Sequence, residues 1–105
     1  MSFDMNKMLR EAQRMQEELA KAQEEAATEV VEASAGGGMV TVKANGAGEV
    51  LEIKIDPRAI DPGDPEILED MILAAVSEAL RSARSLMESK MSGLIPGDLG
   101  GLLGG

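Results

Sequence analysis

The first third of the chain has apolar residues at alternating steps of three and four positions. This heptad seam consists of Met5, Met8, Ala12, Met15, Leu19, Ala22 and Ala26. A repeat held over about three heptads, with no Gly or Pro inside it, is typical of one face of an α-helix. Asp4 stands where a helix N-cap is expected. The pattern predicts a helix over residues 4–27, and its alanine-rich seam buries too little surface to be stable without a partner.

The apolar period changes to two in the middle of the chain. Val40 and Val42 alternate with polar residues, and Leu51, Ile53 and Ile55 alternate in the same way one run later. Strict alternation is typical of a β-strand with one buried face. We therefore expect Val40, Val42, Leu51 and Ile53 to pack in the core or in a dimer interface.

Two glycine-rich breaks divide this stretch into three runs. One is Gly36-Gly37-Gly38, and the other begins with Asn45-Gly46. Asn-Gly between alternating runs is a strong hairpin signal, because both residues tolerate a positive φ. A hairpin turn also explains the three glycines better than a phosphate-binding loop, whose sequence pattern is missing. The pattern predicts an antiparallel meander with strands near 28–35, 38–45 and 48–56.

A turn-rich acidic connector follows, and a second helix begins after it. Asp64 is expected to be the N-cap of this helix, with Pro65 at its first position. The broad apolar face that follows predicts a helix over 65–91. The fold class is therefore α+β, an α-β-β-β-α subunit with a three-stranded antiparallel sheet and two long helices. We expect a single domain over 1–91 and a flexible Gly/Pro/Leu-rich tail over 92–105.

The apolar surface exceeds what one subunit can cover. A three-stranded sheet has two faces, and two helices rich in Ala and Met cannot easily bury both. We therefore expect a homodimer. Packing in the core is the simpler interpretation of the methionines in the heptad seam, and a soft recognition surface is the alternative.

Composition excludes most kinds of catalysis. The chain has no Cys, His, Trp or Tyr, and Phe3 is its only aromatic residue. The usual nucleophile–base pairs and the usual ligands of zinc, haem and iron–sulfur clusters are therefore missing. Proteins that bind single-stranded nucleic acid also need aromatic side chains on which the bases stack. We expect no enzymatic activity, no cofactor, no metal and no small-molecule substrate.

Four acidic residues raise a weaker metal hypothesis. Asp56, Asp61, Asp64 and Glu66 are close in sequence, but their spacing does not fit an EF-hand loop. A helix cap and turns explain this cluster better, so a carboxylate-only metal enzyme is a distant alternative.

The net charge of −9 disfavours a general attraction to nucleic acid or to anionic membranes. The first ten residues carry charges and lack the apolar core of a signal peptide. No apolar run approaches the roughly 18 residues that span a bilayer. We expect a cytoplasmic protein without membrane contact.

Basic residues are nevertheless concentrated in two segments. Residues 4–16 and 71–92 each carry a net charge of +1, whereas the rest of the chain is acidic. On a helical wheel, Lys7, Arg10 and Arg14 lie opposite the heptad seam. If the two helices run antiparallel, the start of the first lies beside the end of the second, and both basic ends meet at one tip. The candidate phosphate-binding residues are Lys7, Arg10, Arg14, Arg81, Arg84 and Lys90.

Spacing alone favours a simpler interpretation of the same charges. Arg81 follows Glu78 by three positions, and Arg84 precedes Glu88 by four. Such pairs are common on solvated helix faces and need no ligand.

An ordered set of segments resembles one family. The segments are Met8–Gln16, rich in Met and Gln, then Gly38–Val42 followed by Asn45-Gly46, then Val50–Pro57, and Leu68–Val76 with Ala79 one turn on. In this order and with these gaps, the chain resembles the YbaB/EbfC family of bacterial nucleoid-associated proteins.

The resemblance implies a tweezer-like homodimer with helical arms projecting from a sheet-based core. It also implies binding of double-stranded DNA with little sequence preference, a location in the nucleoid, and a protein partner from the DNA repair or replication machinery. Lys7, Arg10 and Arg14 match the arm helix, and Arg81 and Arg84 match the other arm element. The third strand has Leu51-Glu52-Ile53-Lys54, where members of this family often carry more basic residues.

Two functional hypotheses follow. The first is a dimeric DNA-binding protein that contacts phosphates through the basic tips of its arms. The alternative is a dimeric protein-interaction module, an adaptor for repair or replication machinery without direct DNA contact.

Overall fold

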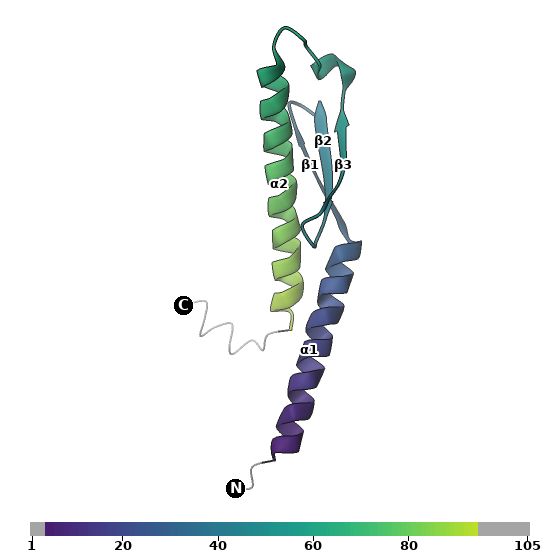
Figure 1. The fold of residues 1–105 in the computed structure, drawn as a ribbon, viewed down its shortest axis with the longest axis vertical. Coiled ribbons are helices and arrows are strands. Elements are labelled where there is room, and N and C mark those ends of the chain that lie inside the picture. Colours follow the sequence, from purple (N-terminus) through teal and green to yellow (C-terminus); the bar gives the residue numbers. More distant parts are fainter. Residues whose placement is uncertain (1–3, 95–105) are drawn as a thin grey trace, which may run out of the picture.

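The computed structural model describes residues 4–94 and confirms the α-β-β-β-α order (Figure 1). The elements are α1 (Met5–Thr28), β1 (Val30–Ala35), β2 (Val40–Asn45), β3 (Val50–Ile55), the 3-10 helix η1 (Pro57–Ala59) and α2 (Pro65–Ser92). Of the tail expected over 92–105, Ser92 belongs to α2, and residues 95–105 lie outside the described part of the chain.

Both long helices begin where the sequence predicts. The Asp4 side chain accepts a hydrogen bond from the backbone N–H of Lys7 at 3.1 Å, so it caps α1 as expected. Asp64 occupies the N-cap position of α2 and Pro65 follows it, but the Asp64 side chain makes no capping hydrogen bond. Proline needs no hydrogen-bond acceptor for its nitrogen, so it suits the first position of this helix.

The three strands form the expected antiparallel meander in the order β1-β2-β3. Ala35 pairs with Val40 at one hairpin, and Gly36, Gly37 and Gly38 all have positive φ in the turn between them. Residues that have a Cβ atom rarely adopt a positive φ, which explains the run of three glycines. A β-bulge between Lys43 and Ala44 shifts the register of β2 against β3.

The core lies between one face of the sheet and α2. On β2, Val40, Val42 and Ala44 are fully buried. The helix meets them with the fully buried residues Ala75, Ala79 and Ala83. Because alanine is small, α2 lies close to β1 and β2, as Figure 1 shows, whereas it has little contact with β3. The core prediction is thus confirmed for Val40 and Val42, while Leu51 and Ile53 are about half exposed.

The turn between β2 and β3 anchors the end of α1. The Gly46 N–H donates to the carbonyl oxygens of Ala26 and Glu29, at 2.9 and 3.2 Å. Asn45 is buried, and its side-chain oxygen accepts hydrogen bonds from the N–H groups of Ala47 and Glu49. The predicted hairpin is present, but the reason given for Asn-Gly is wrong. Positive φ occurs at Gly48, and Gly46 is needed for its close approach to Ala26.

The molecule is long and thin. Its extents are 76 × 29 × 16 Å, and its radius of gyration is 20.3 Å, against about 13 Å for a compact chain of this length. Helix α1 leads almost directly into β1 and points away from the sheet, so its N-terminal half extends beyond the end of α2 (Figure 1). Helix α2 therefore lies beside the C-terminal half of α1.

This arrangement corrects one expectation. The start of α1 does not lie beside the end of α2, and the two basic segments do not meet at one tip. The Lys90 ammonium, near the end of α2, lies 2.7 Å from the carboxylate of Glu29, which follows the C-terminal end of α1.

Candidate nucleic-acid interface

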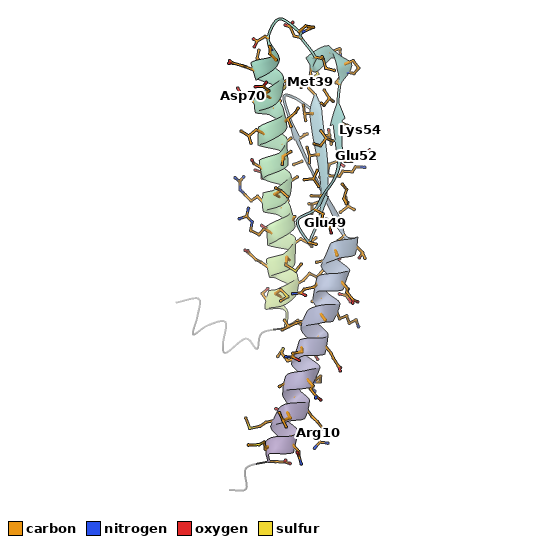
Figure 2. The ribbon with its side chains drawn as sticks, viewed as in Figure 1. Arg10, Met39, Glu49, Glu52, Lys54 and Asp70 are labelled. Atoms are coloured by element: carbon orange, nitrogen blue, oxygen red, sulfur yellow. The ribbon has the colours of Figure 1, made fainter. Side chains whose placement is uncertain are left out.

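The N-terminal part of α1 forms a projecting arm. We define the arm as residues 5–18, all of which are exposed. Lys7, Arg10 and Arg14 lie on it, and Figure 2 shows Arg10 near its free end. The helical spacing of three and four positions places these cations on one side of the arm. Glu11, Glu17 and Glu18 lie on the same side, so the arm has exposed cations but no net charge, and no other element covers it within residues 4–94.

Ion pairing separates the cations into two groups. Within the described residues, five pairs form: Arg14–Glu18, Lys43–Glu52, Arg58–Asp56, Arg81–Glu78 and Lys90–Glu29. The other five cations have no carboxylate partner among residues 4–94: Lys7, Arg10, Lys21, Lys54 and Arg84. Arg14 lies 3.9 Å from Glu18, and its side chain is 74% exposed, so this pair is loose. Lys7 and Arg10 on the arm are therefore available to an external anion, as are Lys21, Lys54 and Arg84 elsewhere.

The three predicted phosphate-binding residues on α2 differ in their ion pairing. Arg81 is engaged by Glu78 on the same helix. Lys90 forms its 2.7 Å contact with Glu29, and this hydrogen bond raises the pKa of the lysine above its ordinary value. Arg84 remains exposed and unpaired within the described part of the chain. Only Arg84 of these three is thus available to bind an anion without breaking an existing pair.

Arg84 lines a hollow between α2 and the β2–β3 turn. The hollow has a volume of about 380 Å³, and its lining consists of Gly46, Ala47, Gly48, Leu80, Arg84 and Met87. Its walls are largely apolar, and the Arg84 guanidinium supplies its only charged side chain. This hollow is well separated from the arm, because Arg10 is 19 residues before Glu29, or about 28 Å along a helix.

An exposed apolar surface runs along the opposite side of the fold from β1. On β3, Leu51 and Ile53 are 53% and 45% exposed. Helix α2 contributes Leu73, which is 67% exposed, and the half-buried Val76 and Leu80. The spacing 73, 76, 80 places these three on the same stripe of α2 as the residues of the hollow. We call Leu51, Ile53, Leu73, Val76 and Leu80 the β3–α2 face.

Sequence reasoning missed the role of Leu73 on this face. The broad apolar face predicted for the second helix includes Val76 and Leu80 but leaves out Leu73, which lies at its edge. The available signal was the spacing of Leu73, Val76 and Leu80, which marks a second stripe beside the alanines. Because α2 is displaced toward β1, Leu73 on that stripe is left exposed, while Val76 and Leu80 are partly buried against the core.

The described residues form neither a metal cluster nor a membrane span. Among residues 4–94, no three His, Cys, Asp or Glu side chains gather closely enough to hold a metal ion. None of the described helices combines the length and the apolar composition needed to cross a bilayer.

The fold and the arm together define a small α+β protein with exposed basic side chains on a projecting helix. The profile of the YbaB/EbfC DNA-binding family matches residues 1–99. The chain belongs to this family, whose members are DNA-binding proteins rather than enzymes.

Similar proteins agree with this assignment. A nucleoid-associated protein of Thermoanaerobacter pseudethanolicus is 48% identical over 95 residues, which cover 90% of this chain and 86% of the relative. Another, from Moorella thermoacetica, is 52% identical over 89 residues, with 85% and 86% covered. The crystal structure of an uncharacterized protein from Helicobacter pylori has the same fold, with a TM-score of 0.80 at 20% identity, covering 90% of this chain and all of that one.

Proposed function

We propose that this protein is a bacterial nucleoid-associated protein that binds double-stranded DNA as a homodimer, largely without sequence preference. The observation that carries the proposal is the exposed arm, where Lys7 and Arg10 have no carboxylate partner among the described residues and Arg14 has a loose one. Lysine and arginine that contact phosphates fix a protein on DNA without reading bases. The similarity to nucleoid-associated proteins supports a location in the nucleoid.

We expect the candidate residues to contribute unequally to DNA binding. Lys7, Arg10 and Arg14 are the main phosphate contacts. Arg84 is a second contact, because its guanidinium is exposed at the edge of the hollow. Arg81 and Lys90 contribute less, since each is already engaged by a glutamate of the same subunit.

The β3–α2 face supports the homodimer. Leu51, Ile53 and Leu73 are exposed on it beside the half-buried Val76 and Leu80, and strand β3 is an edge strand with no neighbour beyond it among the described residues. A two-fold axis at this face would let it pack against its own copy, as in most dimers of identical chains. The arms project away from this face and stay free for DNA.

Salt dependence provides the test. With three phosphate contacts from each arm, the logarithm of the binding constant should fall against the logarithm of salt concentration with a slope of about −5. Fluorescence anisotropy with a labelled duplex measures this slope. Arg10→Gln should reduce its magnitude by about 1.8, because each dimer loses two contacts.

Lys54→Gln is the matched control. Lys54 lies on β3, at the opposite end of the molecule from Arg10 (Figure 2), and its ammonium is also unpaired within residues 4–94. This variant has the same charge change and should leave the slope nearly unchanged. Absence of duplex binding at low salt, with the dimer intact, would contradict the proposal and favour the adaptor alternative.

A further inference from the structure

The heptad seam of α1 is packed at one end and bare at the other. Ala26 is fully buried and Ala22 is 7% exposed, because both lie where α1 meets the rest of the fold. Along the same stripe, the exposed fraction rises to 40% at Met15, 54% at Met8 and 62% at Met5. The expectation that the seam methionines lie in the core is therefore wrong for the arm. The bare half of the seam has no occupant within the described part of this subunit.

The spacing along the seam is that of a coiled coil. Its apolar residues alternate by three and four positions, which is the pattern of the a and d positions of a heptad. In the register where Met5 and Ala12 are a positions, Met8 and Met15 are d positions. In a coiled coil, the side chains at these positions insert between those of a second helix with the same repeat. The bare half of the seam therefore fits another heptad helix.

The arm of a second copy is the helix that matches this surface. Helix α2 is already packed on the sheet through its buried alanines, and the bare half of the seam extends beyond the end of α2 (Figure 1). Among the described elements, an unoccupied heptad seam is found only on the arm. A second arm carries the same repeat, and the small side chain of Ala12 lets two such helices approach closely.

The residues that flank the seam favour a parallel pair of arms. On one flank, the g positions hold Glu11 and Glu18, and on the other flank the e positions hold Leu9 and Gln16. In an antiparallel pair, the g flanks of the two helices face each other, so glutamates would meet glutamates and repel. In a parallel pair, each g position faces the e position of the next heptad, so Glu11 meets Gln16 of the second copy. The Gln16 amide N–H groups donate to such a carboxylate.

We propose that the arms of two dimers pair in parallel through the bare half of the seam, from Met5 to Leu19. The proposal rests on the homodimer proposed above, whose arms project away from the β3–α2 face. Each dimer has two arms, so this contact joins one dimer to the next and leaves a second arm free for another. Lys7, Arg10 and Arg14 occupy outer positions of the pair and stay open to phosphates.

The pair is short, so it forms where arms are crowded. Two heptads that include an alanine bury little apolar surface, and the free energy of pairing is correspondingly small. The arms therefore do not hold subunits together in dilute solution. Dimers bound side by side on one duplex have a high effective concentration of arms, which favours the pair.

Disulfide cross-linking of the full-length protein, at high concentration and without DNA, tests the pairing. The protein has no cysteine, so each substitution introduces a unique thiol. Met8→Cys and Met15→Cys should each form a disulfide with the same position of a second copy, because equivalent d positions face each other in a parallel pair. An antiparallel pair brings at most one of the two positions opposite its own copy. Arg10→Cys, on the outer side of the arm, is the control and should stay reduced.

The number of chains in each particle shows which copies pair. Sedimentation of the dilute Met8→Cys protein should give two chains when it is reduced and four or more after it has been oxidised at high concentration. Two chains in both states would overturn the proposal, because the paired arms would then belong to one dimer. Failure of either cysteine to cross-link would also overturn it. A single chain in the reduced state would instead contradict the homodimer on which the proposal rests.

A charge variant tests the orientation independently. In the Met8→Cys background, Gln16→Lys places a cation opposite Glu11 of the second copy, twice in each parallel pair. The cross-linking yield should rise, with the association constant of the arms higher by about threefold. In an antiparallel pair, e positions face e positions, so the two lysines would repel and lower the yield. Gln13→Lys makes the same charge change outside the interface and is the matched control. A yield for Gln16→Lys that is equal to or below that of Gln13→Lys overturns the proposal, and neither yield depends on DNA binding.

Discussion

Gly46 shows how one residue fixes the arm to the sheet. A Cβ atom at this position would lie 2.5 Å from the carbonyl oxygen of Ala26 and 2.8 Å from its Cβ. Both atoms belong to the last turn of α1, which is also held by the hydrogen bonds from the Gly46 N–H. The absent side chain is what lets the β2–β3 turn touch the helix.

Gly46→Ala should therefore destabilise the protein by about 1–3 kcal/mol, the usual cost of forcing extra volume into a packed contact. Urea unfolding followed by circular dichroism measures the change. Gly93→Ala is the control, because its added Cβ would meet its nearest neighbour, the Lys90 carbonyl oxygen, at 3.5 Å, an ordinary contact distance. Equal stability of Gly46→Ala and the parent would show that the turn does not hold α1.

Asp56 gives a second prediction at the scale of a residue. Its side chain accepts hydrogen bonds from the Arg58 guanidinium and from the Arg58 backbone N–H, and these lower its pKa from 3.8 to about 2. A carboxylate with a lowered pKa stabilises the fold above its unfolded pKa and loses that contribution as the pH falls toward its folded pKa. The contribution of Asp56 should therefore disappear between about pH 4 and pH 2.

Melting temperatures from pH 6 to pH 2 test this expectation. The difference between the parent and Asp56→Asn should be largest above pH 4 and should shrink steadily below it. Glu24→Gln, which removes an exposed carboxylate on α1, is the control for the loss of one charge. A difference that stays constant down to pH 2 would show that Asp56 does not act through its ionised form.

At the scale of elements, the ion pair between Lys90 and Glu29 links the end of α2 to the junction of α1 and β1. Only Glu29 separates α1 from β1, so a contact at this residue bears on the direction of the arm. Lys90 is thus better explained as a positioning residue than as a phosphate contact.

This view predicts that Lys90→Gln weakens DNA binding much less than Arg10→Gln. It should also increase hydrogen exchange in the last two turns of α1, where the contact is lost, and leave β2 unchanged. Mass spectrometry of exchanged peptides measures the second effect. A reduction of the salt slope as large as that of Arg10→Gln would instead place Lys90 on the DNA.

The sequence was sufficient for the elements but not for their placement. Apolar residues recur every 3.5 positions along the seam and every two positions at Val40 and Val42, and both periods reflect local backbone geometry. The predicted bounds of the helices and strands therefore agree with the structure within a few residues. The seam has the same period at Ala26 and at Met8, although one is buried and the other exposed. Periodicity marks the apolar side of a helix, and only the tertiary fold decides which part of that side is covered.

The candidate site was predictable to a similar extent. Charge spacing identified the arm cations correctly as one exposed group. It could not show that Lys90 reaches Glu29, because these residues are distant in sequence and meet only through the packing of α2. Charge spacing also led to the wrong expectation that the basic start of α1 lies beside the basic end of α2. The sequence does not show which parts of two antiparallel helices lie side by side.

At the scale of the whole molecule, the β3–α2 face is the proposed dimer interface. Ile53→Lys and Leu73→Lys should each convert the proposed dimer to a monomer, because a charge would be buried against an apolar surface without a partner. Sedimentation velocity measures the change, and Leu9→Lys on the arm is the control. Monomers should also bind DNA with a smaller salt slope, since each contributes one arm. Dimers that persist in both variants would place the interface elsewhere.

The elongated shape also separates charge along its length. The acidic segment 57–70, with a net charge of −4, lies at the end of the molecule opposite the arm (Figure 1). With 76 Å between the extremes of the subunit, this strongly acidic segment lies far from the arm. We expect a polyanion to repel that acidic end and to meet the arm first. The shape therefore selects the orientation of approach, even for a protein that carries nine negative charges in excess.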